Sequence, residues 1–482
     1  MIADLKPYAE YKESGLPWLG QVPGHWVTKR GKSYLVAIDE RSKTGREELL
    51  TVSSARGVVP RRSANVTMFK AETYAGHKLC WPGDLVINSL WAWGGGLGVS
   101  QHHGIISTAY GVYRSRPAAQ MNPRFLHELV RSSAFHWELQ VRSKGVWISR
   151  LQLTDTAFLD SPIPLPPPAE QAAIVRFLDW ANGRLERAIR AKRKVIALLN
   201  EQKQAIIHRA VTRGLPSTGS GQATPVPLKP SGIPWLGDIP QHWEVQRLRV
   251  LVHQIDQGVS PLAVGFLAEG DSWGVLKSGC VNKGVFRETE HKQLASSFEI
   301  DPAIAVRVGD VLISRACGSP TLVGSVGRVK SLRYQLILSD KTFRACFRDS
   351  VDTDFMVFAM NSPYYRHLVE QAISGAEGMA NNLPLSSLRD FTFAVPPKTE
   401  ASEIAAHLER ETAGIYTAVS RLEREIELLR EYRTRLVADV VTGKLDVREA
   451  AARLPDEAAP DTVEEPADVS DETEPFADET AA

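Results

Sequence analysis

Several short motifs contain residues that could carry out chemistry, but each lacks a partner that the chemistry requires. Gly31–Ser33 matches the end of a phosphate-binding loop, yet Trp26 stands where that loop needs its first glycine. In the glycine run Trp93–Gly98, Val99 stands where a dinucleotide-binding loop needs its third glycine. Two consecutive histidines at 102–103 have no Asp, His or Cys at the spacing of a metal site. The sequence therefore predicts no catalytic residues and no metal ligands in this chain.

Residues suited to binding nucleic acid are more abundant than residues suited to catalysis. Arg and Lys reach phosphates and the acceptor edge of guanine, and they are interleaved with aromatic residues and glycines in both halves of the chain. For any single cation, a solvated surface charge is the simpler interpretation. The residues that we expect to contact DNA are Arg61, Arg62, Trp91, Lys144, Lys277, Ser278, Arg315 and Lys341.

The charge of the chain is unevenly distributed. The net charge of +1 includes eleven acidic residues, and no Lys or Arg, between Pro455 and Ala482. The rest of the chain therefore has 57 basic against 45 acidic residues, which favours a polyanionic partner. We expect residues 447–482 to form an acidic disordered tail, because this composition cannot bury enough apolar surface to fold. A solubilising tail is the simplest interpretation of this segment.

The sequence has no sign of export or membrane insertion. No window approaches the run of roughly 18 apolar residues that a membrane-spanning helix needs. The opening residues lack the apolar stretch of a secretory signal, and the four cysteines include no Cys-x-x-Cys pair. We therefore expect a cytoplasmic protein that does not bind a membrane.

An internal repeat determines how these residues are arranged. SGLPWLGQVPGHW (Ser14–Trp26) recurs as SGIPWLGDIPQHW (Ser231–Trp243), with nine of thirteen positions identical. The other repeated pairs are LPPPAEQAAIVRFLD and VPPKTEASEIAAHLE, VTRGL and VTGKL, and PGDLVINS and VGDVLISR. The period is too long for a solenoid, so the sequence predicts a tandem duplication of one unit, a globular part followed by a helix.

Each copy ends in a segment with the heptad pattern of a coiled coil. Apolar or small residues recur at alternating steps of three and four, and each segment is long enough for a helix of about 60 Å. Such apolar stripes cannot stay solvated, so we expect the two helices to pack against each other. The predicted seam includes Ile174, Leu178, Leu185, Ala188, Val195, Leu199 and Ile206 in the first helix, and Ile404, Leu408, Ile415, Leu422, Leu429 and Tyr432 in the second.

The sequence therefore predicts a mixed α+β protein that consists of six segments. Within the globular parts, we expect helices over Asn122–Leu139 and Asp352–Ile373 and short strands in PGDLVINS and VGDVLISR. The predicted segments are a first globular domain (1–165), the first helix (166–215), a linker (216–230), a second globular domain (231–395), the second helix (396–446) and the acidic tail (447–482).

The repeated motifs resemble those of one protein family, the specificity subunits of Type I restriction–modification systems. The Trp-containing segments resemble the opening motif of that family, and LPPPAEQ resembles the entry into its conserved helices. The segments VTRGL and VTGKL resemble the ends of those helices. The second helix entry departs from the pattern, because Ala401 stands where the first copy has Gln171. The resemblance covers about residues 12–446.

The resemblance implies a fold and a set of partners. Two target-recognition domains would be joined by two conserved helices in an antiparallel coiled coil with pseudo-twofold symmetry, and each domain would read half of a split site in double-stranded DNA. Two methyltransferase subunits would dock near the helices, and restriction (motor) subunits would join them. S-adenosylmethionine, ATP and magnesium would belong to those partners, so this chain would hold no cofactor. The helix length then predicts half-sites held a fixed distance apart.

Two alternatives remain open from the sequence. The chain could be a DNA-binding scaffold of this architecture that serves another effector. It could also methylate or cleave DNA alone, since Asn-Ser-Pro-Tyr at 361–364 is similar to the Asn/Asp-Pro-Pro-Tyr loop of amino-methyltransferases. That segment lacks the first proline of the loop, and no glycine-rich cofactor loop precedes it.

Overall fold

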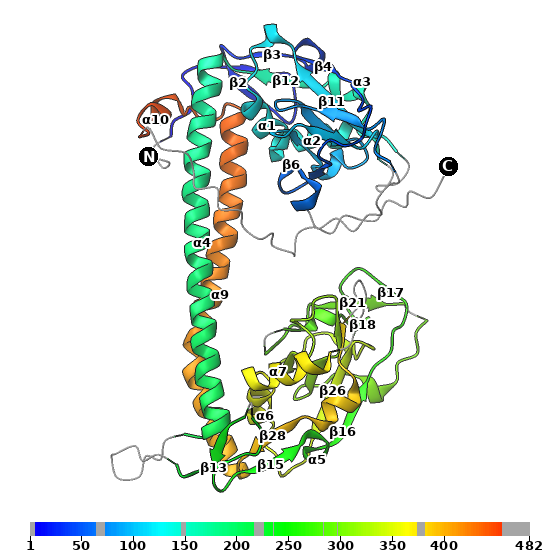
Figure 1. Cartoon of the computed structure of the whole chain (residues 1–482), viewed down its shortest axis with the longest axis vertical. Coiled ribbons are helices and arrows are strands. Elements are labelled where there is room, and N and C mark those ends of the chain that lie inside the picture. Colours follow the sequence, from blue (N-terminus) through cyan, green and yellow to red (C-terminus); the bar gives the residue numbers. More distant parts are fainter. Residues whose placement is uncertain are drawn as a thin grey trace. The chain divides into compact units, whose positions relative to one another are not determined.

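The computed structural model describes residues 5–63, 73–145, 151–215, 226–234, 236–282, 284–295, 297–373 and 381–455. The chain divides into two compact units (Figure 1): unit 1 is Met1–Lys192 with Glu423–Ala482, and unit 2 is Arg193–Leu422. Both units combine helices and strands, which confirms the predicted mixed α+β class. The division falls inside both long helices, so each unit contains one globular domain and part of each helix.

The globular domain of unit 1 is built on a four-stranded antiparallel sheet in the order β4-β11-β8-β9. The strand predicted in PGDLVINS is confirmed as β8. Phe125 and Phe135, from two short helices, pack in the same core as Leu85 and Leu97 of the sheet. The elements are β4 (Leu35–Ala37), β8 (Leu85–Asn88), β9 (Leu97–Val99), β11 (Tyr110–Ser115), α1 (Pro123–Arg131) and α2 (Ser133–Arg142).

The globular domain of unit 2 contains a six-stranded sheet in the order β16-β26-β22-β24-β20-β19 and a four-stranded sheet in the order β17-β21-β18-β25. The strand predicted in VGDVLISR is confirmed as β22. The six strands of the first sheet are β16 (Val252–Gln257), β19 (Val281–Asn282), β20 (Val285–Phe286), β22 (Val311–Ser314), β24 (Val326–Arg328) and β26 (Thr342–Phe347). The second sheet has β17 (Ala263–Val264), β18 (Trp273–Leu276), β21 (His291–Leu294) and β25 (Gln335–Ile337).

Each predicted globular helix is two helices in the structure. In unit 1 the break falls at Ser132, whose hydroxyl accepts a hydrogen bond from the backbone N–H of Phe135 and so begins α2. In unit 2, α6 (Thr353–Ala359) ends before a new helix, α7 (Pro363–Ala372), begins at a proline. The single-helix predictions were wrong, because local capping residues interrupted an otherwise continuous apolar pattern.

The two long helices are α4 (Pro168–Arg213) and α9 (Lys398–Val441). Residues later in α4 contact residues earlier in α9. In unit 1, Lys192 pairs with Glu425 at 2.5 Å and Glu186 with Arg433 at 3.4 Å. In unit 2, the Lys203 ammonium lies 4.4 Å from the ring centroid of Tyr416. Within each unit the helices are therefore antiparallel.

The predicted seam of α4 drifts by one residue after Leu185. Ile189 is 3% exposed and Ile207 is 2% exposed, whereas the predicted Val195 is 44% exposed. An α-helix turns once per 3.6 residues, so a strict 3.5-residue seam rotates away from the partner helix. In α9, Ile404 and Leu408 are fully buried as predicted, while Tyr432 is 42% exposed. Leu199, Leu422 and Leu429 are half-buried, whereas Ile174, Leu178 and Leu185 are buried.

The predicted acidic tail begins too early in the sequence. Residues 448–452 form a helix, α10 (Arg448–Ala452), that packs in the core of unit 1. Val447 and Ala451 are buried because they join the apolar cluster around Trp26, and Leu454 is also buried. The prediction was wrong for residues 447–455, and residues 456–482 lie outside the described part of the chain.

Candidate nucleic-acid interface

The repeated His-Trp dipeptide holds the start of each long helix. In unit 1, Glu170 in the first turn of α4 accepts hydrogen bonds from the Tyr8 hydroxyl at 2.6 Å and the Trp26 indole at 2.8 Å. The His25 ring lies 2.7 Å from the same carboxylate. Glu170 and Trp26 are both buried, with exposed fractions of 4% and 0%. The motif that identifies the repeat is therefore a structural clamp.

The second copy repeats the clamp with a more open carboxylate. Glu400 accepts from the Trp243 indole at 3.0 Å, and its other oxygen lies 2.6 Å from the His242 ring. The Glu400 side chain is 27% exposed. Antiparallel strand pairs connect each clamp to the end of its globular domain. They are β3 (Val27–Arg30) with β12 (Pro162–Leu165), and β15 (Glu244–Arg247) with β28 (Thr392–Val395). Each globular domain is thus fixed to the long helix that follows it.

The Gly-Asp motif of each copy forms an ion pair with an arginine on a neighbouring strand. Asp84 precedes β8 and accepts two hydrogen bonds from the Arg114 guanidinium, at 2.8 and 2.9 Å. Asp310 precedes β22 and pairs with Arg344 at 3.3 Å, and Arg344 also pairs with Asp256 at 2.6 Å. These groups fix the strands that carry the residues after them, and Arg344 is too buried to reach DNA.

The structure brings the four predicted contacts of unit 2 together. Arg315 follows β22, and its backbone N–H donates to the carbonyl oxygen of Lys341 at 2.8 Å. Ser314, beside Arg315, places its hydroxyl 3.4 Å from the carbonyl oxygen of Ser278. Lys277 continues this surface and lies 3.9 Å from Glu290. We call Lys277, Ser278, Arg315 and Lys341 the unit 2 cluster.

The unit 2 cluster has limited freedom to contact a ligand. The Arg315 guanidinium donates to the carbonyl oxygen of Asp340 at 2.8 Å and lies 5.6 Å from the Phe343 ring centroid. Lys341 pairs with the Asp340 carboxylate at 2.8 Å and is 48% exposed. Because a guanidinium has five N–H groups, Arg315 keeps donors for a second partner while Asp340 fixes its direction.

Sequence reasoning missed three asparagines next to this cluster. The short strand β27 (Asn381–Asn382) pairs with β23 (Ala316–Cys317), which directly follows Arg315. The amide oxygens of Asn382 and of Asn282 are buried without a hydrogen-bond partner among the described residues. An asparagine amide matches the edge of adenine. The buried oxygens of Asn382 and Asn282 cannot reach a base in this arrangement, so Asn381, whose amide donates to the Gly318 carbonyl oxygen, is the candidate base-reading group of the three. Only their proximity in the fold identifies them, because isolated asparagines have no sequence signal.

Unit 1 has an equivalent cluster with different residues. Ser89 follows β8 in the same way that Arg315 follows β22. The Ser89 carbonyl oxygen accepts a hydrogen bond from the Leu153 N–H at 2.9 Å, and the Arg315 carbonyl oxygen accepts one from the Leu383 N–H at the same distance. Lys144 is exposed and lies beside this point, since its backbone pairs with Gln152. The two copies of the repeat therefore place different side chains, Ser89 and Arg315, at the same position after equivalent strands.

Trp91 lies in the same region but is half-buried, and it packs on its own loop. Its ring is 4.5 Å from that of Trp93, centroid to centroid, and a Cβ added at Gly94 would lie 2.6 Å from it. The glycine run thus wraps the Trp91 ring, which leaves less of it to stack on a base.

Arg61 and Arg62 lie in a separate short 3₁₀ helix, where Arg62 pairs with Glu48 at 3.0 Å.

Two features of the described residues bear on metal binding and thiol chemistry. No group of three or more His, Cys, Asp or Glu among them could hold a metal ion. Burial raises the pKa of the Cys80 thiol to about 11 and that of the Cys280 thiol to about 12. Both thiols therefore stay protonated near neutral pH, where a thiolate would be needed for nucleophilic attack.

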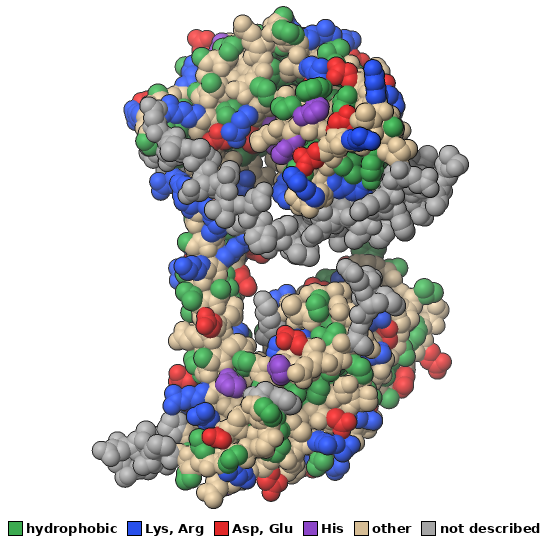
Figure 2. All heavy atoms as spheres, viewed as in Figure 1, with side chains coloured by type: hydrophobic (Ala, Val, Ile, Leu, Met, Phe, Trp, Pro, Cys, Tyr) green, Lys and Arg blue, Asp and Glu red, His purple; other side chains and the backbone are tan. Residues whose placement is uncertain are grey.

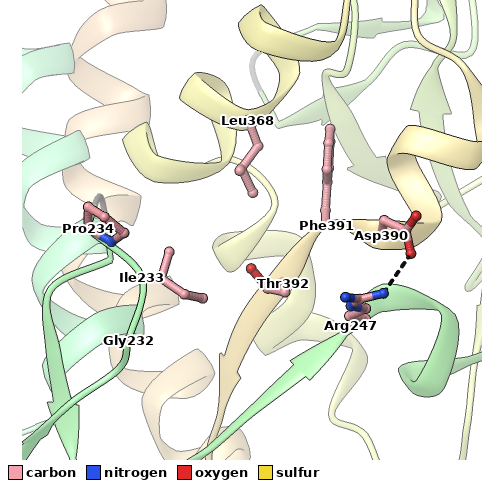
Figure 3. Close-up of a pocket in the computed structure, with 8 residues that line it drawn as sticks. All are labelled: Gly232, Ile233, Pro234, Arg247, Leu368, Asp390, Phe391 and Thr392. Atoms are coloured by element: carbon pink, nitrogen blue, oxygen red, sulfur yellow. Dashed lines mark hydrogen bonds and ion pairs between the residues drawn. The ribbon is translucent and has the colours of Figure 1, made fainter.

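A pocket of about 380 Å³ lies in unit 2. Figure 3 shows it between Ile233 of the repeated loop and Leu368 and Phe391 of the globular domain. Its charged groups, Arg247 and Asp390, pair with each other at 3.4 Å. Unit 1 repeats this ion pair between Arg30 and Asp160 at 3.5 Å. The pair therefore belongs to the duplicated framework.

A buried histidine makes the stability of unit 1 depend on pH. The ring Nδ1 of His127 accepts a hydrogen bond from the Val99 N–H at 3.1 Å. Burial, with a smaller effect from Arg131, lowers the pKa of His127 to about 4. An unfolded chain binds this proton near pH 6.5, so unit 1 loses stability as the pH falls from about 6.5 to 4.

Replacing His127 by glutamine is expected to remove this dependence. Between about pH 7.5 and 4.5 the wild-type chain should lose on the order of 2–3 kcal/mol more stability than His127→Gln. Urea unfolding at several pH values measures the difference. The exposed His103 serves as the control, and a His103→Gln chain that lost the same dependence would contradict the assignment.

Comparisons with known proteins find sequence similarity to specificity subunits of Type I restriction enzymes. The chain is 29% identical over 174 residues to the EcoEI specificity subunit of Escherichia coli, which covers 36% of this chain and 29% of that protein. It is 24% identical over 315 residues to the MjaVIII specificity subunit of Methanocaldococcus jannaschii, covering 64% and 68%. It is 22% identical over 338 residues to the EcoKI specificity subunit of Escherichia coli K12, covering 68% and 67%.

A solved structure has a similar fold. It is a chain from work on complex assembly and conformational transition of the type I R-M system, with a TM-score of 0.52, 18% identity, and coverage of 88% of this chain and 99% of that one. No family model matches the sequence. The chain spans less than a third of the length of the first relative and about two thirds of the other two. Among the described residues, no helix is long and apolar enough to cross a membrane.

Proposed function

We propose that this chain is the DNA-recognition subunit of a restriction–modification complex, because its sequence is similar to Type I restriction enzyme specificity subunits and its fold is similar to that of a chain from a type I R-M system. In this function, each globular domain reads one half of an asymmetric, bipartite site. The observation that carries the proposal is that the unit 2 cluster and the region of Ser89 and Lys144 occupy one position of a duplicated fold with different side chains. A duplicated framework with divergent contact residues is suited to reading two different half-sites.

The partners follow from the same proposal. Two methyltransferase subunits would dock along α4 and α9, and restriction subunits would complete the complex. S-adenosylmethionine, ATP and magnesium would then be bound by those subunits, and this chain would act in the cytoplasm without catalysis of its own. The fixed spacing between half-sites stays a prediction from helix length.

Sequencing the modified bases of cells with and without this chain tests the proposal. The expected result is a split motif that is methylated only when the chain is present. Binding of S-adenosylmethionine by the purified chain would favour the stand-alone methyltransferase instead. A pull-down that recovers no DNA methyltransferase would favour a scaffold that serves another effector.

Replacing Arg315 by alanine is expected to weaken binding of the cognate DNA. A base-reading arginine should cost about 1–3 kcal/mol, or roughly 5- to 150-fold in Kd, and relax one position of the site. The measurement is fluorescence anisotropy with duplexes that vary each position of one half-site. Arg315→Lys separates loss of charge from loss of the planar guanidinium.

The control is Lys330→Ala, which removes an exposed cation of unit 2 that pairs with Glu409. It should leave the relative affinities for the duplexes unchanged. Equal losses in Arg315→Ala and Lys330→Ala, or none in either, would remove Arg315 from the proposed interface. Matching unfolding curves exclude a folding defect.

A further inference from the structure

One exposed face of α4 in unit 1 is strongly basic. Arg184, Arg187 and Arg190 follow one another at steps of three, so their side chains lie on one side of the helix. Arg184 and Arg187 are exposed and Arg190 is half-buried. We call these three residues the arginine stripe. None of them forms an ion pair with another residue in the described part of the chain, although Arg184 lies over the Trp180 ring at 5.3 Å. Figure 2 shows Lys and Arg side chains on the exposed stretch of the long helices, together with Asp, Glu and hydrophobic side chains.

The arginine stripe exists in only one copy of the repeat. At the offset of 230 residues, α9 has Gly414, Thr417 and Ser420 at the corresponding positions, all of them exposed. Two identical subunits that dock on equivalent faces of the two helices would need similar contacts on both. The arginine stripe therefore fits a binding partner that is present in one copy and contacts α4 but not the equivalent face of α9.

An acidic segment of the same chain begins next to the stripe. The Arg176 guanidinium on α4 donates to the carbonyl oxygens of Leu454 at 2.8 Å and of Pro455 at 3.3 Å. Residues 456–482 then contain eleven acidic and no basic residues. Arg176 and Arg190 are about 21 Å apart along the helix axis, whereas 27 residues of extended chain reach up to roughly 90 Å.

We propose that the arginine stripe is the docking surface for the acidic segment 456–482 of this chain. The segment is anchored at Arg176 within reach of the stripe, has the complementary charge, and belongs to the one unit that has the stripe. Bound there, it would compete with DNA phosphates for the same guanidinium groups. Its effect would be to suppress non-specific DNA binding through α4, and the contact would weaken with salt.

Photocrosslinking in the full-length chain tests where the segment lies. With Phe476 replaced by p-benzoylphenylalanine, irradiation in about 50 mM salt should give crosslinks to α4 around the stripe. Replacing all three stripe arginines by glutamine should lower their yield at least about fivefold. A control that replaces Arg209, Arg213 and Arg410, exposed on the same two helices in unit 2, should leave the yield unchanged. Crosslinks that map elsewhere, or persist in the stripe variant, overturn the proposal.

Non-specific DNA binding tests the consequence. A full-length chain with the eleven acids of 456–482 replaced by their amides should bind a duplex without the cognate site about tenfold more tightly at low salt. The gain should disappear when the stripe is also replaced by glutamine. A gain that remains in the combined variant overturns the proposal. The proposal is also overturned if replacing the stripe weakens DNA binding by the same factor whether residues 456–482 keep their eleven acids or carry the amides. In that case the stripe would already be accessible to DNA in the wild-type chain. Neither readout requires methylation or site recognition, so failure here leaves the proposed function untouched.

Discussion

Replacing Glu170 by alanine is expected to lower the free energy of unfolding of unit 1 by about 3–5 kcal/mol. The carboxylate is 4% exposed and accepts from Tyr8 and Trp26, with His25 beside it. Alanine would leave the Tyr8 hydroxyl and the Trp26 indole N–H buried without their acceptor, at a cost of roughly 1–3 kcal/mol for each such group. Chemical unfolding of the full chain, with hydrogen exchange resolved by peptide, measures the loss and locates it.

The second copy of the repeat supplies the matched control. Glu400 makes the same contacts with Trp243 and His242 but is 27% exposed, so water can replace part of what it provides. Glu400→Ala should therefore cost less, about 1–2 kcal/mol, and should act on unit 2. Glu170→Gln keeps an acceptor for the Trp26 indole and should be intermediate. Equal losses for the two alanine variants would contradict the argument from burial.

The repeat allowed the framework to be predicted from the sequence alone. Two copies of each motif indicated two similar folds, and the strands after Gly83-Asp84 and Gly309-Asp310 are confirmed as β8 and β22. The seam of the long helices was harder to predict, because an α-helix and a heptad differ slightly in period. That difference accumulates until Ile189 replaces Ala188 at the interface. The early helical residues Ile174 and Leu178 were unaffected.

The candidate interface could be predicted only in part. Arg315 was predicted because it follows the Gly-Asp strand motif, whereas Ser278 and Lys341 were predicted because they lie in polar segments. The fold brings the three together. Sequence could not show that Arg344 is buried against Asp256, or that Trp91 is wrapped by its own glycines. Both depend on contacts between segments far apart in the chain, and cations or aromatics look alike in sequence whether buried or exposed.

Under the proposed function, exchanging residues 14–165 for the corresponding domain of a Type I specificity subunit is expected to change one half of the DNA site and leave the other intact. Affinity for the original site should fall by about 10³-fold or more, toward the non-specific level. Modified-base sequencing in cells that carry the chimera identifies the new half, and binding to the old and new duplexes measures the change. Exchanging residues 231–395 is the reciprocal experiment and should change only the other half.

The clamp determines which chimeras can succeed. An incoming domain must supply the indole and imidazole of Trp26 and His25, because Glu170 stays in the host and needs both. The host also retains Gln171, whose buried amide accepts from the Asn122 N–H at 2.7 Å and donates to the Pro166 carbonyl oxygen at 2.8 Å. A chimera that meets these requirements separates folding from recognition. If it folds and yet changes both halves of the site, or neither, the two domains do not read DNA independently.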